Sequence, residues 1–366
     1  MRKLLLMVLG LASLVCNAQS IFDVKGLCIA APNASGVAEF VKFIDEELGP
    51  NGINTLVLRV DFNYAYKSRP ELRGQNPLSE AQIKQLVAVA KKHQINLIPQ
   101  VNLLGHQSWA EKTNKLLDVY PQFDETPHVI IPEKYEWPNP DGLYCKSYCP
   151  LHPEVHNVVF DLVDEIIAVF EATAFHAGMD EVFYIADEKC PRCQGKDPAT
   201  LFANEVNKIS RHLADSNKRL WIWGDRLIDA STSGIGMWEA SMNNTARAVD
   251  LIDKSVVICD WHYEKAIPTP AMFALKGFDV IACPWRKPEV AKEQVKMMYN
   301  FKENATPEMK EHFLGIMHTV WSSASEFIKN YHSQKVKEIN PTTQEACFKA
   351  MLAAINELET TSQNSN

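Results

Sequence analysis

Residues 79–103, SEAQIKQLVAVAKKHQINLIPQVNL, contain a helical pattern followed at once by a strand pattern. Within 79–93 the apolar residues Ile83, Leu86, Val87 and Ala90 recur at helical spacing. Residues 96–103 form a short, largely apolar run, which is typical of a buried strand. The stretch therefore predicts one helix-strand unit of an α/β fold.

The same alternation continues through the rest of the chain. Strands are expected at 26–31, 55–61, 96–103, 174–178, 220–223, 256–260, 279–284 and 315–321. Helical patterns at 79–93, 153–170, 198–216 and 289–301 lie between them. Eight strands alternating with helices favour a closed (β/α)8 TIM barrel in a single domain. A doubly wound open sheet is the alternative, but no glycine-rich phosphate motif follows any of the strands.

The first 18 residues are expected to be a signal peptide. Arg2 and Lys3 precede an apolar run, and the small residues near Ala18 fit cleavage after that residue. The mature chain would then be secreted or periplasmic, with one catalytic-type domain over 19–359 and a disordered polar tail over 360–366. We see no other candidate membrane span.

The composition argues against nucleic acid as a partner. The full chain has a formal charge of −8, and loss of Arg2 and Lys3 with the leader would make it two units more negative. An acidic chain with scattered lysines has no basic face for nucleic acid or anionic lipid. The sequence does not decide the oligomeric state.

Eight cysteines follow the leader. Four lie in apolar or helical segments and are expected to be buried small hydrophobic side chains: Cys28, Cys259, Cys283 and Cys347. The other four lie in polar loops: Cys145, Cys149, Cys190 and Cys193. For these four, disulfides are the default in an exported protein, and a structural zinc site and free thiols are the alternatives.

Polar and aromatic side chains follow nearly every expected strand. In a TIM barrel, catalytic groups lie at the carboxyl ends of the strands, because the loops there surround the open mouth. These positions hold Asp61, His106, Asp180, Glu181, Trp223, Asp225, Trp261, Tyr263, Trp285 and Trp321. Indole rings stack on the apolar faces of sugars, so the tryptophans favour a carbohydrate site, although they could also cap the core.

Asp180 and Glu181 follow the strand at 174–178 directly. One carboxyl group of such a pair can stay protonated as a general acid, because its charged neighbour and a partly dry pocket raise its pKa. The charged neighbour can then orient a polar group of the substrate. The pair is therefore the best candidate for the reacting groups.

Two segments resemble those of family 20 glycoside hydrolases, the β-N-acetylhexosaminidases. Residues 97–106, LIPQVNLLGH, resemble the third-strand segment of that family. Residues 176–181, HAGMDE, resemble its fourth-strand signature, in which histidine, any residue and two glycines precede aspartate and glutamate. The resemblance covers most of 55–182 and then weakens to strand-end tryptophans as far as Trp321.

The resemblance implies hydrolysis of β-linked N-acetylhexosamines (GlcNAc or GalNAc) by substrate-assisted retaining catalysis, with a glycan as substrate and no cofactor. Glu181 would be the general acid and base, and Asp180 would orient the 2-acetamido group of the substrate. Tyr263 would donate a hydrogen bond to the acetamido oxygen. Substrate-binding roles would fall to Asp61, His106, His176, Trp223, Trp238, Trp261, Tyr263, Trp285 and Trp321.

The chain departs from the family pattern at three places. Met179 replaces the second glycine, the first strand lacks an arginine, and no glutamate follows two residues after Trp321. The absent arginine and glutamate are the groups that bind sugar hydroxyls in the family. The sequence therefore leaves open the sugar, the linkage, and whether the action is exo or endo. Asp61, Arg59 or Asp225 are candidate substitutes.

Two other functions stay open. One is a non-catalytic carbohydrate-binding protein on a hydrolase-like barrel. The other is a glycosidase with an enzyme nucleophile, for which Asp61 or Glu239 could supply the second carboxylate.

Overall fold

The computed structural model of the chain describes residues 20–134, 145–333 and 342–364. Eight parallel strands form a closed barrel in the order β1-β10-β9-β8-β7-β6-β3-β2, and β1 closes it by pairing with both β2 and β10. The strands are β1 (Val24–Ala30), β2 (Thr55–Arg59), β3 (Asn96–Leu103), β6 (Ala174–Gly178), β7 (Arg219–Trp223), β8 (Val257–Trp261), β9 (Val280–Cys283) and β10 (Phe313–Thr319). Each overlaps the range expected from the sequence, so the predicted barrel is confirmed.

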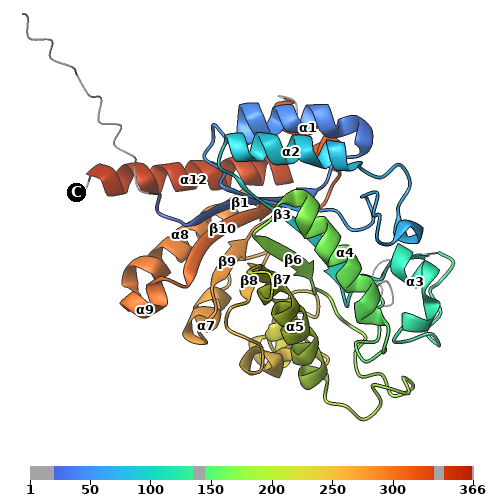
Figure 1. Cartoon of the computed structure of the whole chain (residues 1–366). Coiled ribbons are helices and arrows are strands. Elements are labelled where there is room, and N and C mark those ends of the chain that lie inside the picture. The colour runs from blue at the N-terminus through green and yellow to red at the C-terminus, as the bar shows by residue number, and fades with distance from the viewer. Residues whose placement is uncertain (1–19, 135–144, 334–341, 365–366) are drawn as a thin grey trace, which may run out of the picture.

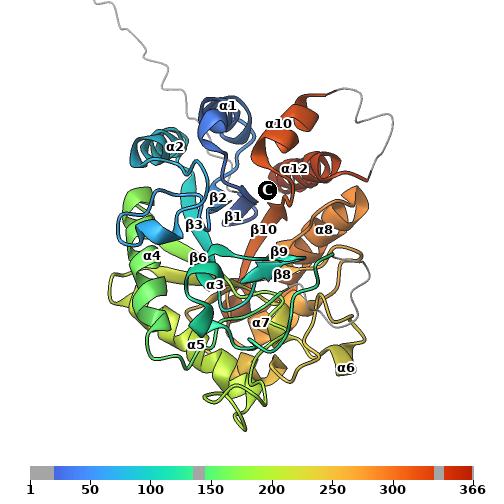
Figure 2. The ribbon, with the colours of Figure 1, turned by 90° about the vertical axis from the view of Figure 1, so that its right-hand side faces the viewer.

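Helices surround the barrel on its outside (Figures 1 and 2). The longer ones are α1 (Val37–Phe43), α2 (Glu80–Lys92), α4 (Val155–Phe170), α5 (Pro198–Ala214), α7 (Thr269–Leu275), α8 (Pro288–Asn304), α10 (Ala324–His332) and α12 (Gln344–Asn364). Between β7 and β8 the described chain has only the short α6 (Ala230–Ser233) and two 3-10 turns, which leaves a long loop at that part of the mouth. The loop after β3 carries the hairpin of β4 (Ser108–Trp109) and β5 (Lys112–Thr113) and the helix α3 (Lys115–Val119), and α9 (Pro307–Lys310) precedes β10.

Helix α2 illustrates how local sequence positions these elements. Ser79 and Gln82 form a reciprocal capping box, with Gln82 N donating to Ser79 Oγ and Ser79 N donating to Gln82 Oε1. The apolar stripe that includes Ile83 and Leu86 is buried against the strands. The helix predicted from the spacing of these residues is therefore confirmed.

The apolar core has two layers. The outer layer lies between the strands and the helices. The inner layer fills the barrel and consists of Val24, Cys28, Val57, Ile98, Ala174, Trp221, Trp223, Val257, Cys259, Trp261, Ile281, Cys283 and Met317. Cys28, Cys259 and Cys283 line the interior, and Cys347 is buried in α12, so the prediction of four buried cysteines is confirmed.

The carboxyl-terminal tail differs from the expectation. Residues 360–366 were expected to be disordered, but α12 continues to Asn364. The hydroxyls of Thr360 and Thr361 donate to the carbonyls of Asn356 and Glu357, each at 2.8 Å, and thus bond back within the helix. Ser362 also lies 3.1 Å from the Tyr299 hydroxyl of α8. The expected signal peptide lies outside the described residues.

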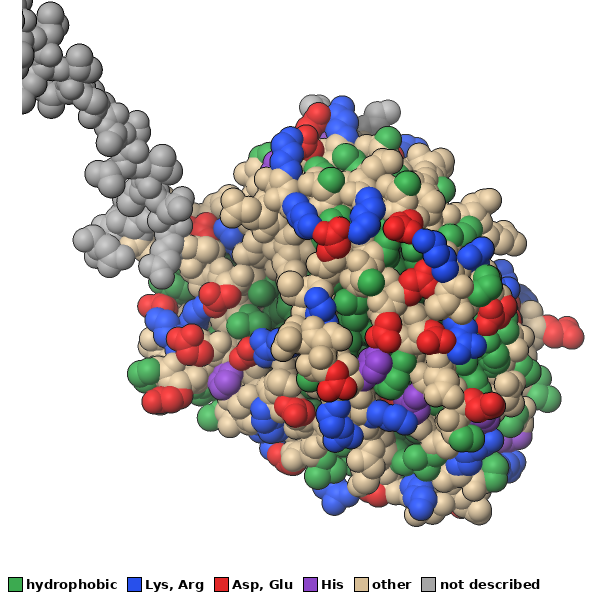
Figure 3. Space-filling model, in the orientation of Figure 1, with side chains coloured by type: hydrophobic (Ala, Val, Ile, Leu, Met, Phe, Trp, Pro, Cys, Tyr) green, Lys and Arg blue, Asp and Glu red, His purple; other side chains and the backbone are tan. Residues whose placement is uncertain are grey.

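Acidic and basic side chains are interspersed over the face shown in Figure 3. None of the helices that the structure describes has the length and hydrophobicity of a membrane span. The interspersed charges on the face in Figure 3 do not form an extended basic patch.

Candidate active site

The acid pair lies in a sharp turn at the end of β6. Gly178, Met179 and Glu181 all have left-handed backbone conformations, with φ of +69°, +70° and +47°. A side chain at position 178 would collide with Asn102, whose Oδ1 lies 2.2 Å from the place of a Cβ atom. Met179 occupies a conformation that glycine adopts more easily, at a cost of roughly 1–2 kcal/mol. The turn directs Asp180 and Glu181 into the mouth of the barrel.

His106 joins the two carboxyl groups. Its Nε2 lies 3.0 Å from Asp180 Oδ2 and 3.5 Å from Glu181 Oε2. Burial disfavours the charged form of Asp180, but attraction to His106 and their hydrogen bond outweigh it, so the pKa of Asp180 lies below its usual value. Burial opposes the charge on His106 as well, yet attraction to Asp180 raises the pKa of His106 well above its usual value. The two residues therefore form an ion pair in which Asp180 is buried and His106 is partly exposed.

The two oxygens of Asp180 have different surroundings. Oδ2 is bound to His106. Oδ1 is buried and has no hydrogen-bond partner among the described residues. A buried carboxylate oxygen without a donor is costly, so this atom is suited to receive a donor from a bound molecule.

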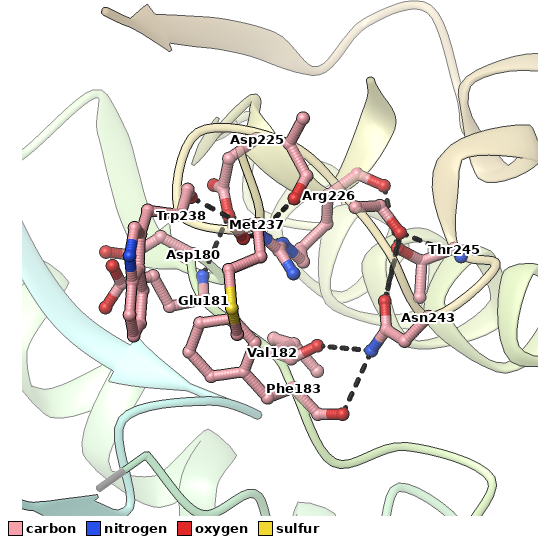
Figure 4. A network of polar contacts seen from close by, with 12 residues as sticks. Asp180, Glu181, Val182, Phe183, Asp225, Arg226, Met237, Trp238, Asn243 and Thr245 are labelled. Atoms are coloured by element: carbon pink, nitrogen blue, oxygen red, sulfur yellow. Dashed lines mark hydrogen bonds and ion pairs between the residues drawn. The ribbon is translucent and has the colours of Figure 1, made fainter. Parts of the chain in front are cut away.

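The backbone of Glu181 is held by a network that starts in the 3-10 turn Asp225–Leu227, just after β7 (Figure 4). Its amide donates to Asp225 Oδ2 at 2.9 Å, and Arg226 Nε donates to the same oxygen at 2.7 Å. Trp261 Nε1 donates to the other oxygen, Asp225 Oδ1, at 3.2 Å. Asp225 and Arg226 are both fully enclosed, with 1% exposure each. Asp225 therefore positions the acid pair and is not free to grip a sugar hydroxyl.

The same network holds the long loop after β7. Arg226 donates to the carbonyls of Met237, Trp238 and Ala240. Trp238 in turn packs edge-on against Phe183, with ring centroids 5.3 Å apart. Trp238 is thereby placed beside the loop that carries the acid pair, as Figure 4 shows.

Aromatic rings cover the opposite side of the mouth. Tyr263 lies between Trp261 and Trp285, with centroid distances of 4.8 and 5.2 Å. Trp321 Nε1 donates to the Tyr263 hydroxyl at 2.9 Å. Gln344 Oε1 accepts from both Trp285 Nε1 and the Trp321 amide. Trp285, Trp321 and Gln344 line a cavity of about 410 Å³, which neither Asp180 nor Glu181 borders.

Two predicted substrate-binding residues lie deeper than expected. Trp223 has 0% exposure and packs against His176 at 4.6 Å and Trp321 at 6.1 Å. His176 is also fully buried, and its Nδ1 accepts the Gly178 amide. Trp223 belongs to the inner apolar layer and His176 packs on it, so both form the floor beneath the site.

Two further candidates from the sequence, Arg59 and Asp61, lie at the end of β2 and just after it. Asp61 accepts the Asn102 amide at 2.8 Å, and burial raises the pKa of Asp61 above its usual value. Arg59 donates to the Val320 carbonyl and lies over Trp321, 4.5 Å from the ring centroid. Arg59 is thus the guanidinium that adjoins the aromatic side.

Sequence reasoning missed Trp109 and Gln344. Trp109 lies in the β4–β5 hairpin, is 57% exposed and stacks on His106 at 5.8 Å. The sequence signal that could have placed Trp109 at the mouth is its position three residues after His106. Gln344 comes from α12, far along the chain, and no pattern in the sequence connects it with the mouth.

The four loop cysteines do not form one cluster. Cys149, Cys190 and Cys193 lie together with Glu125, whereas Cys145 accepts the His106 amide at 3.2 Å beside the acid pair. The four-cysteine zinc set was therefore wrong in one member. All four are free thiols in this structure.

Known proteins share both the sequence pattern and the fold. The family model described as glycosyl hydrolase family 20, catalytic domain, matches residues 61–336. The chain belongs to glycosyl hydrolase family 20. The predicted family is thereby confirmed, and with it the class of glycoside hydrolases.

Individual members of family 20 are distant from this chain. A beta-hexosaminidase of Porphyromonas gingivalis is 27% identical over 156 residues, which cover 41% of this chain and 19% of that protein. One from Akkermansia muciniphila is 26% identical over 143 residues, which cover 37% of this chain and 26% of that protein. These matches therefore span about a fifth to a quarter of the length of these relatives.

Solved family 20 structures have the same fold. A Flavobacterium johnsoniae chitobiase superposes with a TM-score of 0.62 at 16% identity, covering 93% of this chain and 51% of that one. A Bacteroides fragilis β-N-acetylhexosaminidase gives 0.61 at 13% identity, covering 92% and 66%. At these identities the likeness establishes the fold alone.

Proposed function

We propose that the chain is a glycosidase that hydrolyses β-linked N-acetylhexosamines by substrate-assisted retaining catalysis. The observation that carries the proposal is how the two carboxylate oxygens of Asp180 are bonded. His106 binds one oxygen of this residue and, against the effect of burial, holds its pKa below the usual value, and the other oxygen is buried without a donor among the described residues. An acetamido N–H would supply that donor.

In the first step, Glu181 gives its proton to the glycosidic oxygen as the bond to the anomeric carbon breaks. The acetamido carbonyl oxygen of the substrate attacks the same carbon and forms a cyclic oxazolinium ion. Asp180 accepts the acetamido N–H and stabilises the positive charge that develops on the ring. In the second step, Glu181 takes a proton from water, whose oxygen opens the ring with net retention.

The aromatic side supports the binding part of the proposal. Tyr263, Trp285 and Trp321 offer ring faces and a hydroxyl opposite the carboxyl groups. Stacking on apolar sugar faces is the common use of such rings. The exposed Trp109 next to His106 extends this surface on the other side.

The contacts to sugar hydroxyls would set the sugar specificity. Arg59 over Trp321 is the strongest candidate for a contact to sugar hydroxyls, since Asp225 is committed to Glu181 and Arg226. Hydrolysis of the matching aryl glycosides decides between GlcNAc and GalNAc. We also propose that the chain is exported, on the leader pattern of residues 1–18.

Hydrolysis of an aryl N-acetylglucosaminide and galactosaminide, with inhibition by a thiazoline analogue of the oxazolinium ion, tests the proposal. We expect turnover of at least one substrate and competitive inhibition by the thiazoline. Glycan binding without any turnover would instead select the carbohydrate-binding alternative. Turnover that the thiazoline does not inhibit would favour an enzyme nucleophile.

A further inference from the structure

A second cluster of reactive side chains lies apart from the acid pair, between the loops that follow β3 and β6. It consists of Glu125, Cys149, Cys190 and Cys193, and none of these four residues is more than 2% exposed. One carboxylate oxygen and the three sulfur atoms all lie within 4.8 Å of one another. The proposed glycosidase chemistry uses none of the four.

The carboxylate in this cluster is incompletely bonded. Glu125 Oε1 accepts the Asp187 amide at 3.0 Å. Glu125 Oε2 is buried without a hydrogen-bond partner among the described residues. The groups that face this carboxylate are the Cys190 and Cys193 thiols. Thiols are weak donors and offset little of the hydration that a buried carboxylate loses, which makes a bound cation the natural partner.

The sulfur atoms have the spacing of metal ligands. Cys149 Sγ lies 3.5 Å from Cys193 Sγ and 3.6 Å from Cys190 Sγ. A disulfide would require about 2.05 Å. Thiolates held about 2.3 Å from one zinc ion in tetrahedral geometry lie about 3.8 Å apart. The spacing is close to the second value and far from the first.

The local backbone also fits a ligand loop. Cys190 and Cys193 have the two-residue spacing of paired zinc ligands. The chain folds back between them, with Gln194 N donating to the Cys190 carbonyl and Lys196 N donating to the Cys193 carbonyl. Gly195 then takes a left-handed φ of +69°. The turn over residues 190–194 lets both sulfur atoms lie within 3.6 Å of Cys149 Sγ.

We propose that Glu125, Cys149, Cys190 and Cys193 bind one Zn²⁺ ion in a closed, structural site. Three thiolates and one carboxylate complete a tetrahedron and leave no position for water or substrate. Binding releases the three thiol protons to solvent as the sulfur–zinc bonds form. No redox step is involved.

The site would fasten together the two loops that flank the acid pair. Cys149 belongs to the loop after β3, which also carries Cys145 and His106. Cys190 and Cys193 belong to the loop after β6, which also carries Asp180 near its start. Zinc would therefore hold His106 in register with Asp180 without touching either residue.

Metal analysis of the purified full chain tests the proposal. The protein is prepared under reducing conditions in the presence of zinc, desalted, and measured by elemental analysis and native mass spectrometry. We expect one zinc per chain, lost in Cys149→Ser and Cys193→Ser and weakened in the nearly isosteric Glu125→Gln. Cys145→Ser and Cys347→Ser are matched controls, each removing a buried thiol, and should both retain one zinc.

The wild-type chain gives a result even where a variant fails to fold. Replacement of zinc by Co²⁺ should produce the near-ultraviolet absorption of thiolate-to-cobalt charge transfer, and a chelator should abolish it and lower the melting temperature. A chain that binds no zinc and has all thiols free would overturn the proposal. So would a chain whose intact mass is lower by two hydrogens through a Cys149–Cys193 disulfide, or one in which Cys145→Ser abolishes binding.

Discussion

The two sides of the barrel mouth are built from different chemistry. On the side of β3, β6 and β7, charged groups are fixed by short hydrogen bonds, as in the chain from His106 to Asp180 and from Glu181 to Asp225. On the side of β8, β9 and β10, Tyr263 and the neighbouring tryptophans pack by their ring faces. The polar groups that meet these rings include the Tyr263 hydroxyl, the Gln344 amide and the Arg59 guanidinium.

We expect the two sides to contribute differently to catalysis and to substrate binding. Fixed charges stabilise charge that develops in a transition state, because they need no reorganisation when the reaction occurs. Ring faces bind the substrate and its transition state about equally, and this mainly lowers KM. Changes on the charged side should therefore reduce kcat, whereas changes on the aromatic side should raise KM.

Replacement of the general acid should have the largest effect. We expect Glu181→Gln to lower kcat for an aryl N-acetylhexosaminide by roughly 10²–10⁴-fold, since a positioned proton donor contributes about that much. KM should change little. Glu188→Gln is the matched control, an exposed glutamate in the same loop. An equal fall in kcat in both variants would contradict the division between the two sides. So would a rise in KM in Glu181→Gln without a fall in kcat.

Replacement of the acetamido partner should have the next largest effect. In Asp180→Asn the developing positive charge loses its carboxylate, so kcat should fall by about 10²–10³-fold, the usual size for one lost electrostatic contact in a transition state. The thiazoline analogue should bind more weakly in parallel. Steady-state kinetics and inhibition constants check this, and undiminished thiazoline binding would exclude Asp180 from the role.

Removal of an aromatic wall should act on binding. Trp321→Ala removes a ring face and the donor to the Tyr263 hydroxyl, and we expect KM to rise about tenfold, as for the loss of about 1.4 kcal/mol of binding. Trp321→Phe keeps a ring face and should recover part of this loss. A fall in kcat as large as that in Asp180→Asn would show that the aromatic side takes part in the chemistry.

The smallest expected effect is a shift in pH dependence. The pKa of Asp180 is low because attraction to His106 outweighs burial. In His106→Gln burial remains and the attraction is lost, so the pKa of Asp180 should rise. The acid limb of kcat/KM, which requires charged Asp180, should therefore move to higher pH. His212→Gln on α5 is the control, because its ring bonds Asp164 away from the mouth. If the acid limb of His106→Gln lay at the same pH as that of the wild type, the ion pair between His106 and Asp180 would be contradicted.

The sequence predicted the parts of the site that follow directly from the strands. Apolar runs that end in polar or aromatic residues mark the carboxyl ends of barrel strands, and this rule found His106, Asp180, Glu181 and Tyr263. The same rule placed Trp223 in contact with substrate, but its side chain points into the barrel interior and is fully buried. The position of a residue relative to the end of its strand predicts only approximately how deep its side chain lies in the barrel.

The parts built by loops were not predictable in this way. Trp109, Gln344 and Glu125 reach their places through long connections whose path depends on tertiary packing. The four loop cysteines were grouped by sequence alone, and the structure separates Cys145 from the others. Pairing between residues on different loops leaves no periodic signal in one sequence.

The central claim is that the acetamido group of the substrate is the nucleophile and that Asp180 orients it. The most direct measurement compares matched aryl β-glycosides with and without the 2-acetamido group, on the wild-type chain and on Asp180→Asn. We predict that the wild type hydrolyses only the acetamido sugar and that Asp180→Asn loses most of that activity. Comparable hydrolysis of the sugar without the acetamido group would contradict the claim.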